Sequence, residues 1–260
     1  MAWFTQSSRF AILALALTLS PALTVSAQPS RSSTLGSQLE RAFRPPRRGI
    51  AVNRQGGATR NPDSCFVGTR QLTALVPTTV GETAAEYPTV YWYMPMMSAE
   101  NAPSPELEFT LRDASDNKIY SVKYPLTKSS DGLVSTPGIM SLTLAKPLEV
   151  NKEYKWLLKV TCDATDNSDA KFVVGSLKRV SEDPNLAIRV QQATPEERVV
   201  LYANANRWYE MLANLVALRR SRPNDPSVTD AWNKLFAVVE LDDVSIQSRS
   251  QSTGSTNNSN

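Results

Sequence analysis

The stretch "YPTVYWYMP", residues 87–95, places four aromatic side chains in nine positions, with a proline near each end. Side chains alternate between the two faces of a β-strand. Val90, Trp92 and Met94 share one face, carry no charge and include a tryptophan, which gains much free energy from burial. The stretch therefore predicts a strand over residues 89–94 that turns this face toward a protein core.

The opposite face of this strand carries a row of tyrosines, Tyr87, Tyr91 and Tyr93. Three interpretations are open: the helices that follow cover the row, it is simply exposed, or it recognises sugar rings or a peptide. A tyrosine suits recognition because its ring is flat and apolar and its tip is polar. The candidate binding surface consists of these three tyrosines together with Trp208 and Tyr209.

Six more strand-like runs lie on both sides of this stretch, separated by segments that contain Pro, Asn, Asp or Gly. They cover residues 70–76, 106–112, 118–124, 138–144, 153–162 and 171–180. Seven short strands divided by turn residues are typical of a two-sheet sandwich. We therefore expect an α+β protein whose residues 63–182 form an antiparallel immunoglobulin-like β-sandwich.

The segment "PLEVNKEYKW", residues 147–156, supports this fold class. Leu148, followed by Tyr154 and Trp156 beyond a turn, resembles the tyrosine corner of immunoglobulin and fibronectin sandwiches. In such a corner the phenol hydroxyl bonds to the backbone a few residues upstream. Tyr154 is therefore predicted to have a structural role.

Helical patterns begin after Pro184, over residues 195–205, 207–223 and 226–241, with apolar residues three and four apart. Thr194, Pro195 and Glu197 form a typical helix start with a capping box. The spacing resembles about one and a half tetratricopeptide repeats, too few for an independent solenoid. We expect residues 183–244 to be a C-terminal tetratricopeptide-like helical segment docked on the sandwich.

The N-terminus has the pattern of a signal peptide over residues 1–27: Arg9, an apolar run over residues 10–19, and small residues that end at Ala27. The apolar run is too short to span a bilayer comfortably, and no later segment approaches a spanning length. We expect an exported mature chain, periplasmic or secreted, without a transmembrane segment after cleavage.

Residues 28–62 are predicted to be a disordered Arg-rich arm, because Ser, Gly and Pro leave few apolar anchors. Seven arginines stand against Glu40 alone, a net charge of +6; they are Arg31, Arg41, Arg44, Arg47, Arg48, Arg54 and Arg60. The arm is either a solvated spacer or a weak contact to an anionic surface such as lipid headgroups. Residues 245–260 are predicted to be a disordered polar tail.

The chain contains no histidine and two cysteines. Without histidine, Ser-His-Asp and Cys-His catalysis and the usual zinc and copper ligands are excluded. In an oxidising compartment, Cys65 and Cys162 are expected to form a disulfide. We expect no catalytic residue, no metal and no cofactor.

Two short motifs are weak candidates for chemistry. Residues 115–118, "SDNK", match the Ser-x-x-Lys spacing of penicillin-binding enzymes but lack their other motifs, and they favour a hairpin turn. Asp163, Asp166 and Asp169 offer oxygen ligands to calcium, yet their spacing differs from that of an EF-hand, so a polar loop over 163–169 is the alternative.

The order and spacing of several segments resemble one family. These are "LTALVP", "EYPTVYWYMP", "LEFTLRD", "TPGIMSLTL", "LEVNKEYKWLLKVTCD" and "ATPEERVVLYANANRWYEMLANLVALRR". Together they are similar to the cyanobacterial family known as domain of unknown function 928, over residues 65–241. The resemblance implies a cyanobacterial exported protein, and it implies no activity and no site residues.

Two hypotheses for function follow. The first is a non-catalytic binding or adaptor protein of the cell envelope with a protein partner; nucleic acid is not expected for an exported chain. The second is an envelope hydrolase that acts on glycan or peptide with carboxylates alone. A pocket with two close carboxylates favours the hydrolase, and a groove without such a pair favours the adaptor.

Overall fold

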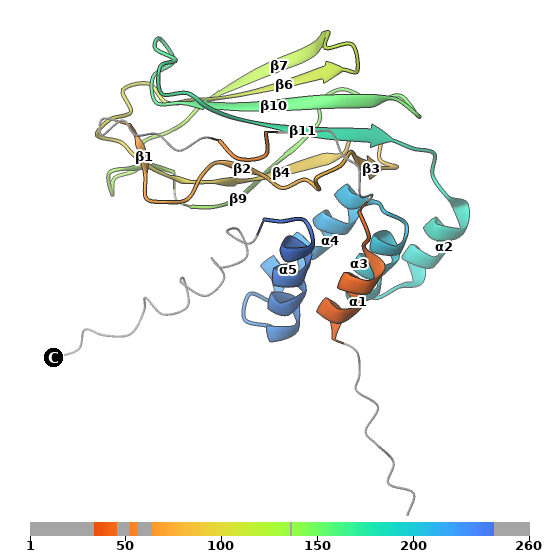
Figure 1. The fold of residues 1–260 in the computed structure, drawn as a ribbon. Coiled ribbons are helices and arrows are strands. Elements are labelled where there is room, and N and C mark those ends of the chain that lie inside the picture. The colour runs from red at the N-terminus through yellow and green to blue at the C-terminus, as the bar shows by residue number, and fades with distance from the viewer. Residues whose placement is uncertain (1–33, 46–52, 57–63, 136, 242–260) are drawn as a thin grey trace, which may run out of the picture. The chain divides into compact units, whose positions relative to one another are not determined.

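The computed structural model describes residues 34–45, 53–56, 64–135 and 137–241, and all of them belong to one unit of the chain. The predicted signal peptide at residues 1–27 and the predicted polar tail at 245–260 lie outside the described residues. Within the described part, strands form three sheets and five α-helices accompany them (Figure 1).

The largest sheet has five strands. In spatial order they are β3 (Gly81–Thr83), β11 (Lys171–Arg179), β10 (Glu153–Thr161), β6 (Glu106–Asp113) and β7 (Lys118–Pro125). All neighbours pair antiparallel except β3, which pairs parallel with β11. Trp156, Leu158 and Val160 of β10 are fully buried and alternate with less buried residues, as expected for one core-facing side.

Two three-stranded sheets complete the β-structure. One contains β2 (Thr73–Ala74), β4 (Thr89–Met94) and β9 (Gly138–Thr143); the other contains β1 (Phe66–Val67), β5 (Met96–Ser98) and β8 (Leu133–Ser135). Figure 1 shows the layer of β2, β4 and β9 facing the layer of β6, β7, β10 and β11. The main core therefore lies between two sheet layers.

The helices after the strands are α2 (Pro184–Gln192), α3 (Pro195–Asn204), α4 (Trp208–Ser221) and α5 (Pro226–Val238). Proline stands in the first turn of α2, α3 and α5, where its missing N–H has no intrahelical partner to lose. The Thr194 side chain accepts from Glu197 N, and the Glu197 carboxylate accepts from Thr194 N, which confirms the predicted capping box.

Helix α4 begins directly against the strands. Trp208 Nε1 donates to Leu75 O at 3.0 Å, and the Tyr209 hydroxyl donates to Ser176 O at 3.1 Å. At Gly81 a Cβ atom would lie 2.9 Å from the Tyr209 ring, so this close approach requires glycine. The contacts join α4 to the sequence around β2, to β3 and to β11.

Two described segments of residues 28–62 are ordered, which corrects the prediction of a disordered arm for these segments. Residues Leu35–Ala42 form α1, which packs on α5 and α3. Leu35, Leu39 and Phe43 are buried, and they are spaced four apart, so one helix turn after another presents an apolar residue to the same side. The short apolar face was not recognised in the sequence because arginine dominates the composition of residues 28–62.

Residues 53–56 of the same arm are also ordered. Arg54 O accepts from Ala74 N, and Gly56 N donates to Leu72 O, so this segment runs beside β2. The Arg54 guanidinium donates to Val76 O and Val239 O. Burial lowers the pKa of Arg54, and the charge of Glu240 partly offsets this effect. Arg54 is therefore engaged within the protein.

Every predicted strand is present, but the run at residues 70–76 contributes two paired residues, Thr73 and Ala74. Four strands of two or three residues, β1, β3, β5 and β8, are additional to the prediction. Strands of two or three residues are too short to show an alternation of apolar and polar residues in the sequence. They form because a neighbouring strand is in position to pair with them. The parallel pairing of β3 also departs from the purely antiparallel arrangement expected.

Candidate binding cavity between the sheets and the helices

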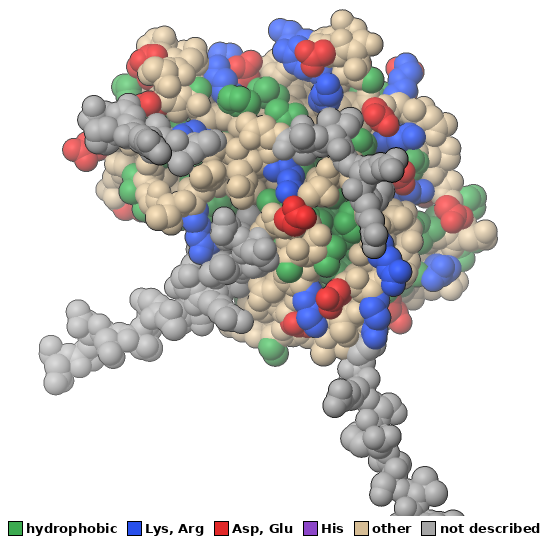
Figure 2. Space-filling model, viewed as in Figure 1, with side chains coloured by type: hydrophobic (Ala, Val, Ile, Leu, Met, Phe, Trp, Pro, Cys, Tyr) green, Lys and Arg blue, Asp and Glu red, His purple; other side chains and the backbone are tan. Residues whose placement is uncertain are grey.

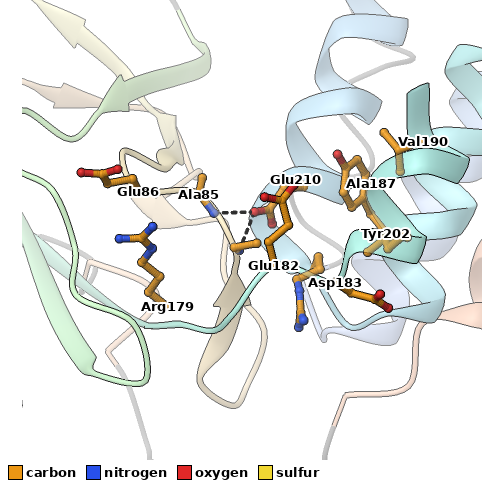
Figure 3. Close-up of a pocket in the computed structure, with 12 residues that line it drawn as sticks. Ala85, Glu86, Arg179, Glu182, Asp183, Ala187, Val190, Tyr202 and Glu210 are labelled. Atoms are coloured by element: carbon orange, nitrogen blue, oxygen red, sulfur yellow. Dashed lines mark hydrogen bonds between the residues drawn. The ribbon is translucent and has the colours of Figure 1, made fainter.

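A cavity of about 410 Å³ lies where the sheets meet the helices. Three parts of the chain line it: the loop after β3, the end of β11 with the segment that joins it to α2, and helices α2, α3 and α4. Figure 3 shows Glu86 and Arg179 on the sheet side, Ala187, Val190 and Tyr202 on the helix side, and Glu210 between them. The cavity therefore forms only when these separate segments assemble.

Glu210 is the central acidic residue of the cavity. It stands in the first turn of α4, where a negative charge is favourable beside the helix N-terminus. Its Oε1 accepts from Thr83 Oγ1 at 2.7 Å, from Ala84 N at 2.8 Å and from Ala85 N at 3.1 Å. These bonds hold the loop after β3 against α4, as the dashed lines in Figure 3 indicate.

The other carboxylate oxygen of Glu210, Oε2, is buried and has no hydrogen-bond partner among the described residues. An unpaired buried acceptor costs about 1–3 kcal/mol, more when it is charged. Because this atom is buried, a ligand in the cavity cannot reach it unless the surrounding residues shift.

Both arginines of the cavity already have structural partners. Arg207 forms an ion pair with Glu82, at 2.8 Å between Nη1 and Oε2. Arg179 donates from Nη1 to the backbone oxygen of Leu148. Because Glu82 is not part of the lining, the pairing of Arg207 does not neutralise a carboxylate of the cavity. The Nε atoms of both arginines are buried without a partner in the described part of the chain.

Four carboxylates line the cavity against these two guanidinium groups: Glu86, Glu182, Asp183 and Glu210. Asp183 caps α2 by accepting from Asn185 N at 2.9 Å. Within the described residues, Glu86 and Glu182 make no ion pair. The cavity therefore carries an excess of negative charge.

The negative charge of the cavity affects the pKa of Tyr202. Burial raises the pKa of its phenol, and the nearby negative charges of Glu210 and Glu182 raise it further, while Arg198 acts in the opposite direction. Tyr202 consequently stays neutral at physiological pH and can both donate and accept a hydrogen bond. Leu186, Ala187 and Val190 of α2 add an apolar wall beside it.

Figure 2 shows positively and negatively charged side chains interspersed over the face in view. A second cavity, of about 350 Å³, has a different character, because its lining is mainly apolar and includes Met94, Leu107, Leu126 and Met140. Of these two cavities, the one at the junction combines charged, aromatic and apolar groups.

The candidate surface predicted from the sequence is mostly buried, which corrects that expectation. Tyr87 is 48% exposed, whereas Tyr91 is 7% exposed and Tyr93 2% exposed. Trp208 and Tyr209 are buried, and their polar atoms bond to the backbone. Because α4 packs against β4, the interpretation that helices cover the tyrosine row fits these contacts.

The residues that were predicted to have a structural role are buried. Cys65 and Cys162 are joined in a disulfide, and both are buried. The Tyr154 hydroxyl accepts from Glu149 N at 2.9 Å. Leu148 is buried just upstream, and Trp156 lies in the core, where its ring stacks with Phe109 at 6.1 Å between centroids.

The two weak motifs lie in turns. Residues 115–118 fall in the hairpin between β6 and β7, where the Asp113 carboxylate accepts from Ser115 N and Asn117 N. Asp163 accepts from Ser104 Oγ and Thr165 N, and Asp166 accepts from Ser168 N. The described residues contain no group of three or more Asp, Glu, Cys or His side chains that could hold a metal ion.

Sequence reasoning did not find Glu210, Tyr202, Glu182 or Arg207. Glu210 was visible only as a charge inside a helix of apolar periodicity, immediately after two aromatic residues. Its partners, Thr83 to Ala85, lie more than a hundred residues earlier, and no local pattern connects the two segments.

The fold and this cavity define a mixed α+β protein with an acidic ligand-sized cavity at the junction of its sheets and helices. The chain belongs to the family described as Domain of Unknown Function (DUF928), whose model matches residues 55–249 of the 260. The match confirms the resemblance seen in the sequence, and it includes every residue that lines the cavity. A comparison with curated proteins found no match.

Proposed function

We propose that this chain is a non-catalytic binding protein of the cell envelope, exported by a signal peptide at residues 1–27, and that the junction cavity holds a basic group of a protein partner. The observation that carries the proposal is the cavity lining: four carboxylates face two arginines that already have structural partners.

A lysine or arginine side chain matches this lining in two ways. Its aliphatic stem packs on apolar surface while its charged head reaches polar groups. The wall of Leu186, Ala187 and Val190 suits the stem, and Glu182 and Glu210 suit the head. Charge-assisted hydrogen bonds to a carboxylate are stronger than neutral ones, so Glu182, which makes no ion pair among the described residues, favours a cationic donor.

The test is calorimetric titration of the mature chain, residues 28–260, with a short N-acetylated peptide amide that contains one lysine. The matched probe is the same peptide with that lysine acetylated. We expect the lysine peptide to bind, the acetylated peptide not to bind, and added salt to weaken the interaction. Equal binding of both peptides would contradict the proposal.

A variant pair locates the binding in the cavity. Glu182→Gln removes one cavity charge and is expected to weaken lysine-peptide binding about tenfold, a difference of about 1.4 kcal/mol. Glu100→Gln is the matched control, because Glu100 is exposed and does not line the cavity. If both variants weaken binding equally, the site lies elsewhere.

The second candidate function is an envelope hydrolase that uses carboxylates alone. Glu182 and Glu210 both influence Tyr202, so two carboxylates lie near one phenol, and a carboxylate pair is what glycoside hydrolysis requires. Against it, Glu210 Oε1 accepts three hydrogen bonds from the protein. Release of soluble fragments from cell-wall material by the wild type, and not by Glu182→Gln, would establish the hydrolase and refute the adaptor.

We also propose that the two sheet layers are an immunoglobulin-like sandwich and that α3, α4 and α5 are a tetratricopeptide-like segment. The bond from Glu149 N to the Tyr154 hydroxyl supports the first assignment. The order of a helix pair, then Pro223, then a further helix supports the second.

Among the described residues, no helix has the length and apolar character needed to cross a membrane.

A further inference from the structure

Strand β9 ends its sheet and turns backbone groups outward. Its one neighbour among the described strands is β4, with which it pairs antiparallel. Leu144 N, directly after β9, donates to Pro88 O at 3.0 Å. In an antiparallel pair, alternate residues turn their N–H and C=O groups toward the neighbouring strand. The N–H and C=O groups of Ile139, Ser141 and Thr143 therefore point away from β4.

The other described sheet edges are protected in the ways that natural proteins use. β7 carries two lysines and ends in a proline, β3 carries a glutamate, and β1, β2 and β8 have only two or three residues each. β9 has six residues, "GIMSLT", none of them charged and none a proline. A long edge without charge is a template for pairing with a further strand.

The core is also incompletely covered on this side of the molecule. The Tyr120 hydroxyl of β7 accepts from Ala145 N, two residues after β9, at 3.2 Å, so the edges of the two layers lie on the same side. Tyr124 of β7 and Met140 of β9 lie opposite buried residues of β6 and β4, which places them on the inner faces. Tyr124 is nevertheless 40% exposed and Met140 46% exposed. Met140 also lines the apolar cavity of about 350 Å³.

We propose that β9 pairs antiparallel with β9 of a second copy of this chain, which joins the two β2-β4-β9 sheets into one across a two-fold axis. Ser141 faces its own counterpart at the axis. Ile139 then faces Thr143 of the second copy, and Met140 faces Leu142 of the second copy. This inference goes beyond the proposed function and does not depend on the junction cavity.

A second copy meets both requirements of this edge. The outward N–H and C=O groups of β9 pair with the same groups of the second copy, as a two-fold interface requires. Met140 and Leu142 of the second copy form an apolar cross-strand pair on the inner face that is partly exposed in the single chain. Because β9 offers no charge that would select a charged strand, an equally uncharged strand suits it, and β9 is itself such a strand.

The first test is sedimentation equilibrium of the mature chain, residues 28–260, for which we expect a dimer that dissociates on dilution. Ser141→Pro removes an N–H that does not bond to β4, and proline is tolerated where the N–H of an edge strand points outward. It should raise the dissociation constant of the dimer at least about tenfold, because each copy loses a hydrogen bond. Ser141→Ala keeps the N–H, and this matched control should dimerise as the wild type does.

The second test uses cysteine cross-linking to examine the register. Both native cysteines are joined in a disulfide, so an added cysteine supplies the one free thiol. Under mild oxidation Ser141→Cys should link two copies, because facing residues of an antiparallel pair lie about 5.5 Å apart. Thr143→Cys is the matched control, since Thr143 is also exposed but faces Ile139 of the second copy. Equal cross-linking of the two variants would contradict the register.

The remaining outcomes also decide the matter. A wild type that stays monomeric at about 100 μM overturns the proposal and leaves the edge to a strand of a different protein. A dimer that Ser141→Pro leaves unchanged lies on another surface and overturns it as well. If Ser141→Pro does not fold, Met140→Lys replaces it, because this change places a charge at an exposed position of the same edge. An unchanged dimer of folded Met140→Lys likewise refutes the pairing.

Discussion

At Gly175 the larger sheet can pack because glycine has no Cβ atom. It stands opposite Trp156 in the pairing of β10 with β11, and the indole ring covers it. A Cβ at Gly175 would lie 2.2 Å from Trp156 Cε2, closer than any non-bonded contact. Trp156 is fully buried, so its rigid ring has nowhere to move.

Gly175→Ala is therefore expected to destabilise the protein by about 3 kcal/mol, the upper part of the usual range for overpacking. The measurement is the midpoint of unfolding in urea. Gly138→Ala is the matched control in another strand, because a Cβ there meets no atom within 4 Å. Equal midpoints for the two variants would show that the Trp156 ring repacks freely.

Tyr154 tests the corner at the same scale. Tyr154→Phe keeps the ring and removes the oxygen that accepts from Glu149 N. Loss of this partner is expected to cost about 1–2 kcal/mol in the free energy of unfolding. Tyr87→Phe, at a tyrosine that is 48% exposed, should leave the midpoint within error. The corner assignment fails if Tyr154→Phe behaves like Tyr87→Phe.

At the scale of the elements, the start of α3 makes stability depend on pH. The Glu197 carboxylate accepts from Thr194 N at 2.8 Å and from Thr194 Oγ1 at 2.9 Å, and these bonds lower the pKa of Glu197 below its ordinary value. A carboxyl whose pKa is lower in the folded state binds protons more weakly there than in the unfolded chain. Its stabilising contribution is thus present above the unfolded pKa and lost as the pH falls through the folded pKa.

Glu197→Gln should accordingly be less stable than the wild type at pH 7, and the difference should shrink as the pH falls below the ordinary glutamate range. Thr194→Ala, which removes the cap itself, should cost about 1 kcal/mol at pH 7. Thermal unfolding of each protein from pH 7 to pH 3 makes the comparison. A difference between Glu197→Gln and the wild type that stays constant over this range would refute the ionic contribution.

The longer elements were predictable because each carries its own periodic pattern. The strand at Thr89–Met94 and the helix start at Thr194 are local features, and both were found. Helix α1 was missed because the arginines of the surrounding arm, residues 28–62, dominated the composition, although Leu35, Leu39 and Phe43 already had helical spacing. The role of Glu210 could not be found locally, because its partners belong to the loop after β3.

At the scale of the whole molecule, three consecutive residues of α4 join the helices to the strands. Trp208, Tyr209 and Glu210 bond to Leu75, Ser176 and the loop at Thr83 to Ala85. A helix pair of this size is only marginally stable without a surface to pack on. The helices and the sheets should therefore unfold together.

Expressing residues 63–182 and 183–245 separately tests this dependence. The helical fragment is expected to show no cooperative melting, because Trp208 and Tyr209 would lose the backbone partners at Leu75 and Ser176 to which they bond. Circular dichroism during heating is the measurement, and the mature chain is the reference. Independent cooperative melting of the helical fragment would show that it is a domain in its own right.

The disulfide between Cys65 and Cys162 has a consequence for how the chain is made. The two cysteines are 97 positions apart, and synthesis at about 5–20 residues per second leaves Cys65 without its partner for about 5–20 s. Because the chain has two cysteines, oxidation within one molecule has a single outcome, and shuffling among wrong internal pairs cannot occur. Errors of oxidation are instead confined to bonds between molecules, and they would appear as covalent dimers of newly made chains.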